Sequence, residues 1–273
     1  MYEAFYRLKE KPFSIQPDPD FLFLGRRHSM AYSMLEYGIQ NNAGFSVICG
    51  EIGCGKTTLI RHLLNNLGSE LTVGMVYNTH QQIDDLLEWI MLAFGQPYEG
   101  MSKIALYDAF QQFLIASYSA GRRVVLIVDE AQNLGPGALE SLRMLSNINA
   151  DKDQLLQIIL VGQPQLRDLL RRTDLQQFFQ RVSVDFFIPP LEPFEVKIYI
   201  NHRLKIAGRE TPLFTLAACE RIAKASLGIP RSINILCDMV LVYGFSAEAK
   251  RIDVDLVEEV LRDRADFGVF STT

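Results

Sequence analysis

The sequence predicts a three-layer α/β fold with a parallel sheet, followed by a small all-helical domain. Three observations predict it. Short apolar runs alternate with helical patterns between residues 45 and 188, a proline-rich segment at 188–195 interrupts them, and only helical patterns follow. Apolar strands without polar alternation are typical of a parallel sheet, because crossover helices cover both of its faces.

The elements follow in chain order. Aromatic and proline residues over 1–25 exclude a long helix and predict an extended arm packed on the α/β core. Strands are predicted at 45–49, 73–77, 124–130, 155–162 and 182–188. Helices of the core are predicted at 29–42, after the glycine loop that follows 45–49, and at 83–94, 102–119 and 136–148. Helices of the last domain are predicted at roughly 193–207, 215–226, 231–246 and 253–264.

This division gives three parts. They are the arm over 1–28, the α/β core over 29–190 and the helical domain over 191–273.

Composition narrows the class of protein. With 48% hydrophobic and 22% charged residues, the 273-residue chain is typical of a soluble globular protein. Its net charge of −5 argues against a dedicated duplex-DNA binder, although a local arginine cluster remains compatible with nucleic acid. We find no signal peptide and no apolar run long enough to span a membrane. The cysteines form no C-x-x-C pair and suit a reducing compartment, so we expect a cytoplasmic protein, able to dock on a membrane partner.

The first motif that indicates chemistry is GEIGCGKT, which lies between a predicted strand and an amphipathic helix. Glycines let backbone N–H groups wrap a phosphate, and the helix that follows directs its positive end at the anion. The lysine of such a loop reaches the β- and γ-phosphates, and the hydroxyl after it binds Mg²⁺. The predicted nucleotide-binding residues are Gly50, Glu51, Ile52, Gly53, Cys54, Gly55, Lys56, Thr57 and Thr58, with Thr57 also a magnesium ligand.

The second motif is VVLIVDEAQ, in which a buried strand delivers two acids to the end of the sheet. We predict that Asp129 holds Mg²⁺, directly or through water, and that Glu130 orients and deprotonates the attacking water. The alternative is a surface acid pair that starts a loop. Gln163 follows the strand at 155–162, and it is predicted to sense the γ-phosphate or to position water; the alternative is a strand-end cap.

Two arginines complete the predicted site. Arg181 precedes the last strand and is predicted to act as an arginine finger on a neighbouring subunit, with Arg171 and Arg172 as rivals. Arg231, in LGIPRSIN, is predicted to begin a helix and to fold over the nucleotide. For both, a surface salt bridge is the alternative. The four histidines are scattered, and none has a metal or triad partner in the sequence.

These motifs resemble the extended AAA+ superfamily, and the whole chain resembles the general-secretion-pathway protein A group, also called ExeA-like. The resemblance rests on MYEAFYRLKEKPFSIQPDPDFLFL, GEIGCGKTTLIRHLL, LIVDEAQNL, LVGQPQL, LQQFFQRVSVDF, YINHRLKIAG and LGIPRSINILCD. It implies a P-loop core with a helical lid, and it implies that Gln163 is sensor 1, Arg181 the finger and Arg231 sensor 2. Longer members carry a transmembrane helix and a peptidoglycan-binding region, so the short length favours the branch encoded beside exosortase and exopolysaccharide genes.

We therefore expect an ATPase that uses ATP and Mg²⁺ as a conformational switch in a bacterial secretion or exopolysaccharide system. We expect a homo-oligomer in the ATP state, with protein partners that are membrane-bound or peripheral to the inner membrane. One alternative is a DNA-associated AAA+ ATPase that controls transposition, because such proteins share the DEAQ-like box. Another is a nucleotide-sensing scaffold that binds ATP without turning it over.

Overall fold

The computed structural model describes residues 1–68, 70–77, 86–150 and 153–267, and they form two compact units. The α/β unit comprises 29–51 and 60–188, and the helical unit comprises 1–28, 52–59 and 189–273. The helical unit therefore combines the arm, most of the glycine loop and the chain after the last strand.

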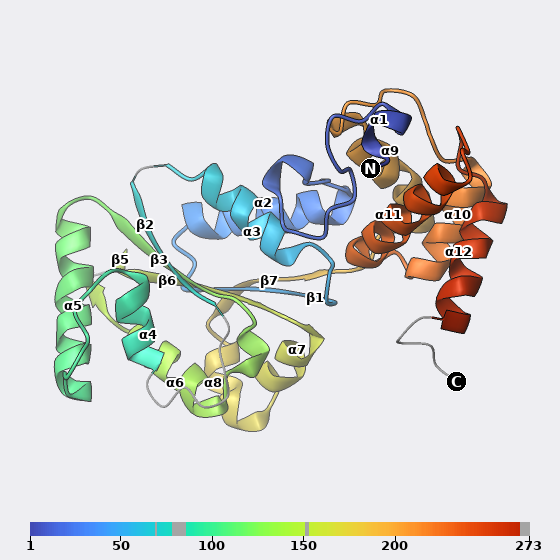
Figure 1. The fold of residues 1–273 in the computed structure, drawn as a ribbon. Coiled ribbons are helices and arrows are strands. Elements are labelled where there is room, and N and C mark those ends of the chain that lie inside the picture. The colour runs from blue at the N-terminus through green and yellow to red at the C-terminus, as the bar shows by residue number, and fades with distance from the viewer. Residues whose placement is uncertain (69, 78–85, 151–152, 268–273) are drawn as a thin grey trace. The chain divides into compact units, whose positions relative to one another are not determined.

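The α/β unit is built on a parallel five-stranded sheet with the order β2-β3-β6-β1-β7 (Figure 1). Its strands are β1 (Phe45–Gly50), β2 (Leu71–Val76), β3 (Arg123–Val128), β6 (Leu156–Gly162) and β7 (Val182–Ile188). A separate short antiparallel pair, β4 (Asn149–Ala150) and β5 (Asp153–Gln154), was not expected. The parallel three-layer sheet predicted from the sequence is confirmed.

Helices cover both faces of this sheet. In Figure 1, α2 and α3 lie on one side, and α4, α6, α7 and α8 lie on the other. The bounds in the core are α2 (Arg26–Gln40), α3 (Lys56–Asn65), α4 (Leu86–Ala93), α5 (Lys103–Ser119), η2 (Ala131–Asn133), α6 (Pro136–Leu145), α7 (Pro164–Leu170), η3 (Thr173–Leu175) and α8 (Gln176–Phe179). The first residues of the helix predicted at 83–94 lie outside the described residues.

The central strands are buried along their whole length, which explains their unbroken apolar runs. Every residue of β1 and of β6 is buried. Alternate side chains of β1, β3 and β6 join one hydrophobic cluster with α4, α5, α6 and α7. On the opposite face the polar Gln157 is buried, and its side-chain amide donates to the carbonyl of Ile39 at 3.1 Å.

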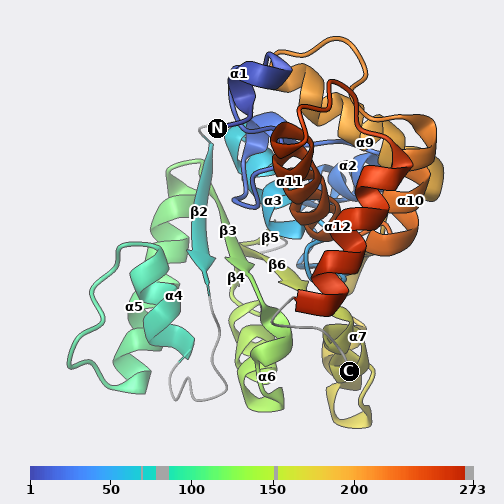
Figure 2. The same ribbon diagram turned by 45° about the vertical axis from the view of Figure 1, so that its right-hand side comes forward.

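The helical unit has a hydrophobic cluster of its own. It contains α1 (Glu3–Tyr6), η1 (Pro19–Phe21), α9 (Pro193–Ile206), α10 (Leu216–Ser226), α11 (Pro230–Ser246) and α12 (Val254–Phe267). Figure 2 shows α9, α10, α11 and α12 grouped together, and α10 contacts the other three. A capping box at Glu192 and Glu195 begins α9, and Pro193 occupies its first turn.

The arm packs differently from the expectation. Its large buried rings Tyr2, Tyr6, Phe13 and Phe21 belong to the cluster of the helical unit, not to the cluster under the sheet. Buried Arg203 on α9 donates to the carbonyls of Pro12 and Ser14, and its guanidinium stacks 4.7 Å from the ring centre of Phe21. These rings find apolar surface on the helices, which the sequence could not identify as their partner.

Candidate nucleotide site

The glycine loop leaves the carboxyl end of β1, and its glycines have conformations that other residues disfavour. Gly53 has φ +83° and Gly55 has φ +89°, both in the region where a Cβ is strained. A Cβ on Gly50 would lie 2.7 Å from the carbonyl oxygen of Ile188 on β7. These positions therefore require glycine for local steric reasons, before any ligand is considered.

The loop continues into α3, which begins at Lys56. The N–H of Leu59 donates to the carbonyl of Gly55 at 2.9 Å, so Gly55 caps the helix. Lys56, Thr57 and Thr58 therefore form the first turn, where helical N–H groups have no intrahelical partner and the dipole favours an anion. Lys56 is buried, whereas Glu51 and Ile52 are exposed.

Two groups outside the loop hold its backbone. The carbonyl of Gly53 accepts from the N–H of Arg231 at 3.2 Å, and the carbonyl of Cys54 lies 2.8 Å from Nε2 of His28. Since a carbonyl only accepts, Nε2 carries the proton. Burial lowers the pKa of His28, although the Cys54 carbonyl and the charge of Glu195 act in the opposite direction.

The acid pair follows β3 directly. The N–H of Asp129 donates to the carbonyl of Val76 at 3.0 Å, which extends the ladder between β2 and β3 by one residue. The carboxylate of Asp129 is buried and accepts from the N–H of Glu130 at 2.9 Å. Glu130 has φ +54°, which is unusual for a residue with a side chain. This conformation turns the chain sharply after the strand and starts η2.

Two glutamine side chains hold the carboxylate of Glu130. Nε2 of Gln132 lies 2.5 Å from Oε2 of Glu130, and Nε2 of Gln163 lies 2.9 Å from the same oxygen. Oε1 of Gln132 in turn accepts from the N–H of Gln163 at 2.9 Å. A Cβ on Gly162 would lie 2.9 Å from that Oε1, so the glycine before Gln163 makes room for the Gln132 side chain.

Strand order brings these residues to one edge of the sheet. β6 pairs in parallel with β3 on one side and with β1 on the other. The carboxyl ends of β3, β6 and β1 therefore lie side by side, and this edge is where α/β sheets bind ligands. Asp129 and Glu130 follow the first of these strands, Gln163 follows the second, and the glycine loop follows the third.

The predicted arginines differ in their surroundings, and of those described here only Arg231 contacts the glycine loop, through its N–H. Arg181 precedes β7 at the amino ends of the strands, where its Nη1 donates to Oγ of Ser146 at 3.0 Å. It lines a polar hollow of about 680 Å³, together with residues such as Asn41, Asn149 and Gln180. Arg172 forms a two-contact ion pair with Asp174, at 3.0 and 2.9 Å. Arg231 has an exposed side chain in the first turn of α11.

Three residues of this region were missed by sequence reasoning. Gln132 bridges Glu130 and Gln163, Gly162 leaves space for it, and His28 contacts the glycine loop. The glutamine of DEAQ, three residues after the first acid, was a signal for Gln132. No signal in the sequence pointed to His28, because its partner Cys54 lies 26 residues away.

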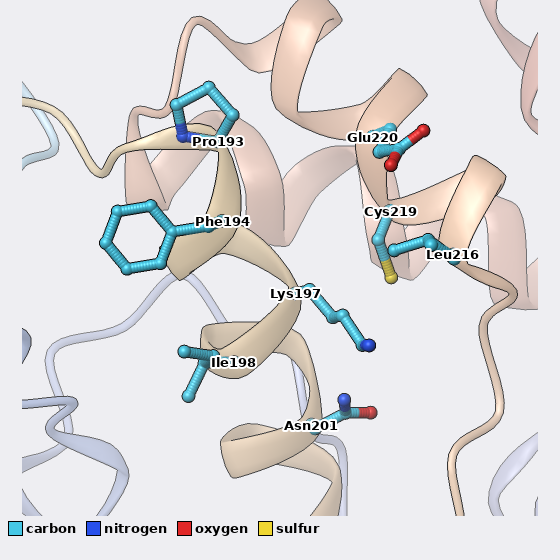
Figure 3. Close-up of a pocket in the computed structure, with 8 residues that line it drawn as sticks. All are labelled: Pro193, Phe194, Lys197, Ile198, Asn201, Leu216, Cys219 and Glu220. Atoms are coloured by element: carbon cyan, nitrogen blue, oxygen red, sulfur yellow. The ribbon is translucent and has the colours of Figure 1, made fainter.

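Another hollow, of about 580 Å³, lies between α9 and α10 (Figure 3). Phe194, Ile198 and Leu216 give it an apolar lining, and Lys197 and Glu220 stand on different helices beside it. No residue of the glycine loop or of the acid pair lines it. The phosphate chemistry therefore does not belong to this hollow.

The oxygen donors near the loop and after β3 suit magnesium. Mg²⁺ takes one or two carboxylates together with phosphate oxygens and water, rather than a cage of protein ligands. In the described part of the chain, no group of three or more His, Cys, Asp or Glu side chains forms such a cage. In the α/β unit, the buried carboxylate of Asp129, oriented by the Glu130 N–H, is an oxygen ligand of this kind. In the helical unit, the Thr57 hydroxyl in the first turn of α3 is another.

Comparisons with known proteins identify the family of this chain. A family model described as an AAA domain matches residues 39–170. The general secretion pathway protein A of Aeromonas hydrophila is 40% identical over 253 residues, which is 92% of this chain. The chain belongs to the ExeA-like AAA+ ATPases. It spans 46% of the length of that relative.

Solved structures show the same AAA+ fold. Cdc6p from Pyrobaculum aerophilum is similar with a TM-score of 0.68 at 17% identity, over 99% of this chain and 72% of that one. The RuvB branch migration motor of Thermotoga maritima has a TM-score of 0.53 at 20% identity, over 90% and 72%. Membership of the AAA+ family implies a nucleotide-binding fold. Across the described residues, no helix is both long and apolar enough to cross a membrane.

Proposed function

We propose that this chain binds ATP with Mg²⁺ at the glycine loop and hydrolyses it with Glu130 as the base. The observation that carries the proposal is the edge of the sheet at which β3, β6 and β1 end. There Asp129 and Glu130 follow β3, and Gln163 follows β6. β6 lies beside β1, the strand that leads into the glycine loop.

Each residue has a distinct proposed role. The loop N–H groups and Lys56 hold the phosphates, and Thr57 and Asp129 hold the metal. Magnesium, when bound, would supply positive charge against the β- and γ-phosphate oxygens. Glu130 would accept the proton of the attacking water on a carboxylate oxygen, while Gln163 contacts that carboxylate and orients it.

We further propose that hydrolysis works as a conformational switch in a secretion or polysaccharide-export assembly at the inner membrane. Support for a secretion role comes from the 40% identity to a general secretion pathway protein. Arg231 would fold over the nucleotide from α11, and Arg181 would act on the nucleotide of a neighbouring copy. Contact of the loop with the N–H of Arg231 supports a link between nucleotide and lid.

The first prediction tests hydrolysis. We expect Glu130→Gln to bind an ATP analogue with nearly unchanged affinity and to lower kcat by about 10²–10⁴, because a general base is lost. Glu140→Gln is the matched control, since that exposed acid pairs with Arg143 on α6. Steady-state phosphate release and fluorescence titration measure the two quantities. Equal turnover of wild type and Glu130→Gln would refute the mechanism, and binding without any wild-type turnover would favour a sensing scaffold.

A further inference from the structure

Two successive carbonyls of the glycine loop are held from outside the loop. The carbonyl of Gly53 accepts from the N–H of Arg231, and the carbonyl of Cys54 accepts from Nε2 of His28. Arg231 is the second residue of α11, and His28 is the third residue of α2. All of these residues belong to the helical unit.

Holding a carbonyl fixes the direction of the next N–H group. In a trans peptide, the C=O of one residue and the N–H of the next point to opposite sides. The described peptides contain no cis bond, so the Cys54 N–H points away from Arg231 and the Gly55 N–H points away from His28. φ is positive at Gly53 and Gly55 and negative between them, which is the alternation that makes successive N–H groups an anion-binding nest.

Packing alone does not explain a histidine at position 28. The side chain is only 4% exposed, and its Nδ1 has no hydrogen-bond partner among the described residues. A leucine would fill buried space without leaving a polar atom unpaired. The imidazole therefore carries an unpaired polar atom, and what it provides is the contact between Nε2 and the Cys54 carbonyl.

The start of α11 is also in close contact with the loop. A Cβ on Gly53 would lie 2.6 Å from Cβ of Arg231 and 3.3 Å from Cγ2 of Ile229. A shift of this helix end would therefore move the Gly53 carbonyl and, with it, the Cys54 N–H.

We infer that His28 is a positioning residue for phosphate binding. By holding the Cys54 carbonyl, it keeps the Gly55 N–H in its anion-binding direction. The N–H of Arg231 holds the Gly53 carbonyl and keeps the Cys54 N–H in its direction in the same way. The inference rests on the proposed binding of nucleotide phosphates at this loop. The cradle is preorganised by the first turns of α2 and α11, so phosphate binding and the position of α11 are coupled.

Phosphate affinity of three His28 variants tests the inference. His28→Leu removes the donor, His28→Gln keeps an amide N–H at similar reach, and His28→Asn carries the same amide one methylene shorter. The probes are a fluorescent ATP analogue and its displacement by inorganic pyrophosphate. We expect His28→Leu and His28→Asn to weaken pyrophosphate binding about tenfold or more, and His28→Gln to restore most of it.

Melting temperatures separate positioning from a structural role. Without nucleotide, His28→Leu is expected to melt near the wild-type temperature, because it removes the unpaired Nδ1 but also the donor to the Cys54 carbonyl. The increase in melting temperature on adding nucleotide should be smaller than in wild type.

Wild-type pyrophosphate affinity in His28→Leu would refute the positioning role of His28. Should that variant fail to fold, equal affinities of His28→Gln and His28→Asn would refute it as well. If wild type itself binds neither probe, the proposed function fails and the positioning role fails with it.

Discussion

At the scale of single residues, the site depends on a strained glutamate held by two amides. Left-handed backbone at a residue with a side chain costs about 1–3 kcal/mol and persists where its surroundings determine it. At Glu130 the surroundings are the amides of Gln132 and Gln163, which meet on one carboxylate oxygen. A hydrogen-bonded carboxylate keeps one orientation, which suits the role proposed for Glu130 as the water-activating base.

The prediction for Gln132 follows from its two contacts. Replacement by leucine removes the donor to Glu130 and leaves the Gln163 N–H without this acceptor. We expect Gln132→Leu to lower kcat by about 10-fold to 100-fold with little change in nucleotide affinity, since each misplaced catalytic group costs about that factor. Asn133→Leu, the next residue of η2, is the control. Steady-state ATPase assays decide, and an unchanged kcat would contradict a positioning role for Gln132.

A pH prediction follows from buried His28. Burial lowers its pKa in the folded protein below the ordinary value of about 6.5, so the unfolded chain binds the proton more strongly. Stability is therefore retained above about pH 6.5 and declines as the pH falls below it, by at most about 1.4 kcal/mol per pH unit. The hydrogen bond to the Cys54 carbonyl and the charge of Glu195 act in the opposite direction on this pKa and reduce the effect.

Denaturant unfolding between pH 7.5 and 5.5 measures the loss. Wild type should lose more stability than His28→Gln, which cannot titrate at this position. His62→Gln is a control at a ring that packs against Tyr32. Parallel pH dependences of stability in wild type and His28→Gln would contradict a lowered pKa of His28.

At the scale of elements, the linker after β7 is tied to the loop that starts α11. The N–H of Leu191 donates to the carbonyl of Gly228 at 2.9 Å, and Gly228 has φ +71°. A Cβ at Gly228 would collide with the carbonyl oxygen of Leu191. This glycine therefore allows the linker to pass close to the turn that carries Ile229, Pro230 and Arg231.

We expect Gly228→Ala to destabilise the protein by more than the left-handed backbone alone costs, which is about 1–2 kcal/mol. Gly121→Ala is the matched control, because Gly121 has φ +70° but nothing within 4 Å of the added Cβ. Chemical denaturation of both variants isolates the collision with Leu191. Equal losses of unfolding free energy in the two variants would show that the linker moves aside without a further cost.

At the scale of the whole molecule, the position of Arg181 bears on which nucleotide it can reach, that of its own chain or that of a neighbouring copy. Arg181 precedes β7, whereas Asp129 and Gln163 follow their strands, so they lie at opposite edges of one parallel sheet. A seven-residue strand such as β7 spans about 23 Å at 3.3 Å per residue. An arginine finger at this position is therefore suited to the nucleotide of another copy.

Mixing two inactive variants tests this prediction. Arg181→Ala and Glu130→Gln should each turn over ATP at least about 10²-fold more slowly than wild type. Together they should regain activity, because an intact Glu130 of one chain can face an intact Arg181 of the other. Arg171→Ala and Arg172→Ala test the rival fingers. A mixture no more active than its components, or a chain that stays monomeric with ATP, would contradict a finger acting between copies.

The sequence by itself determined the order and type of the main elements and the motifs at their ends. Apolar runs such as those of β1 and β6 report burial on both faces directly, and the glycines of the loop report a backbone that other residues disfavour. Only the tertiary structure decided which distant groups meet. The strand order, the packing of the arm rings on the helices and the contact of His28 with Cys54 all join segments far apart in the chain. The physical reason is that periodicity records whether a side chain is buried, whereas the identity of its partner depends on contacts that no local pattern encodes.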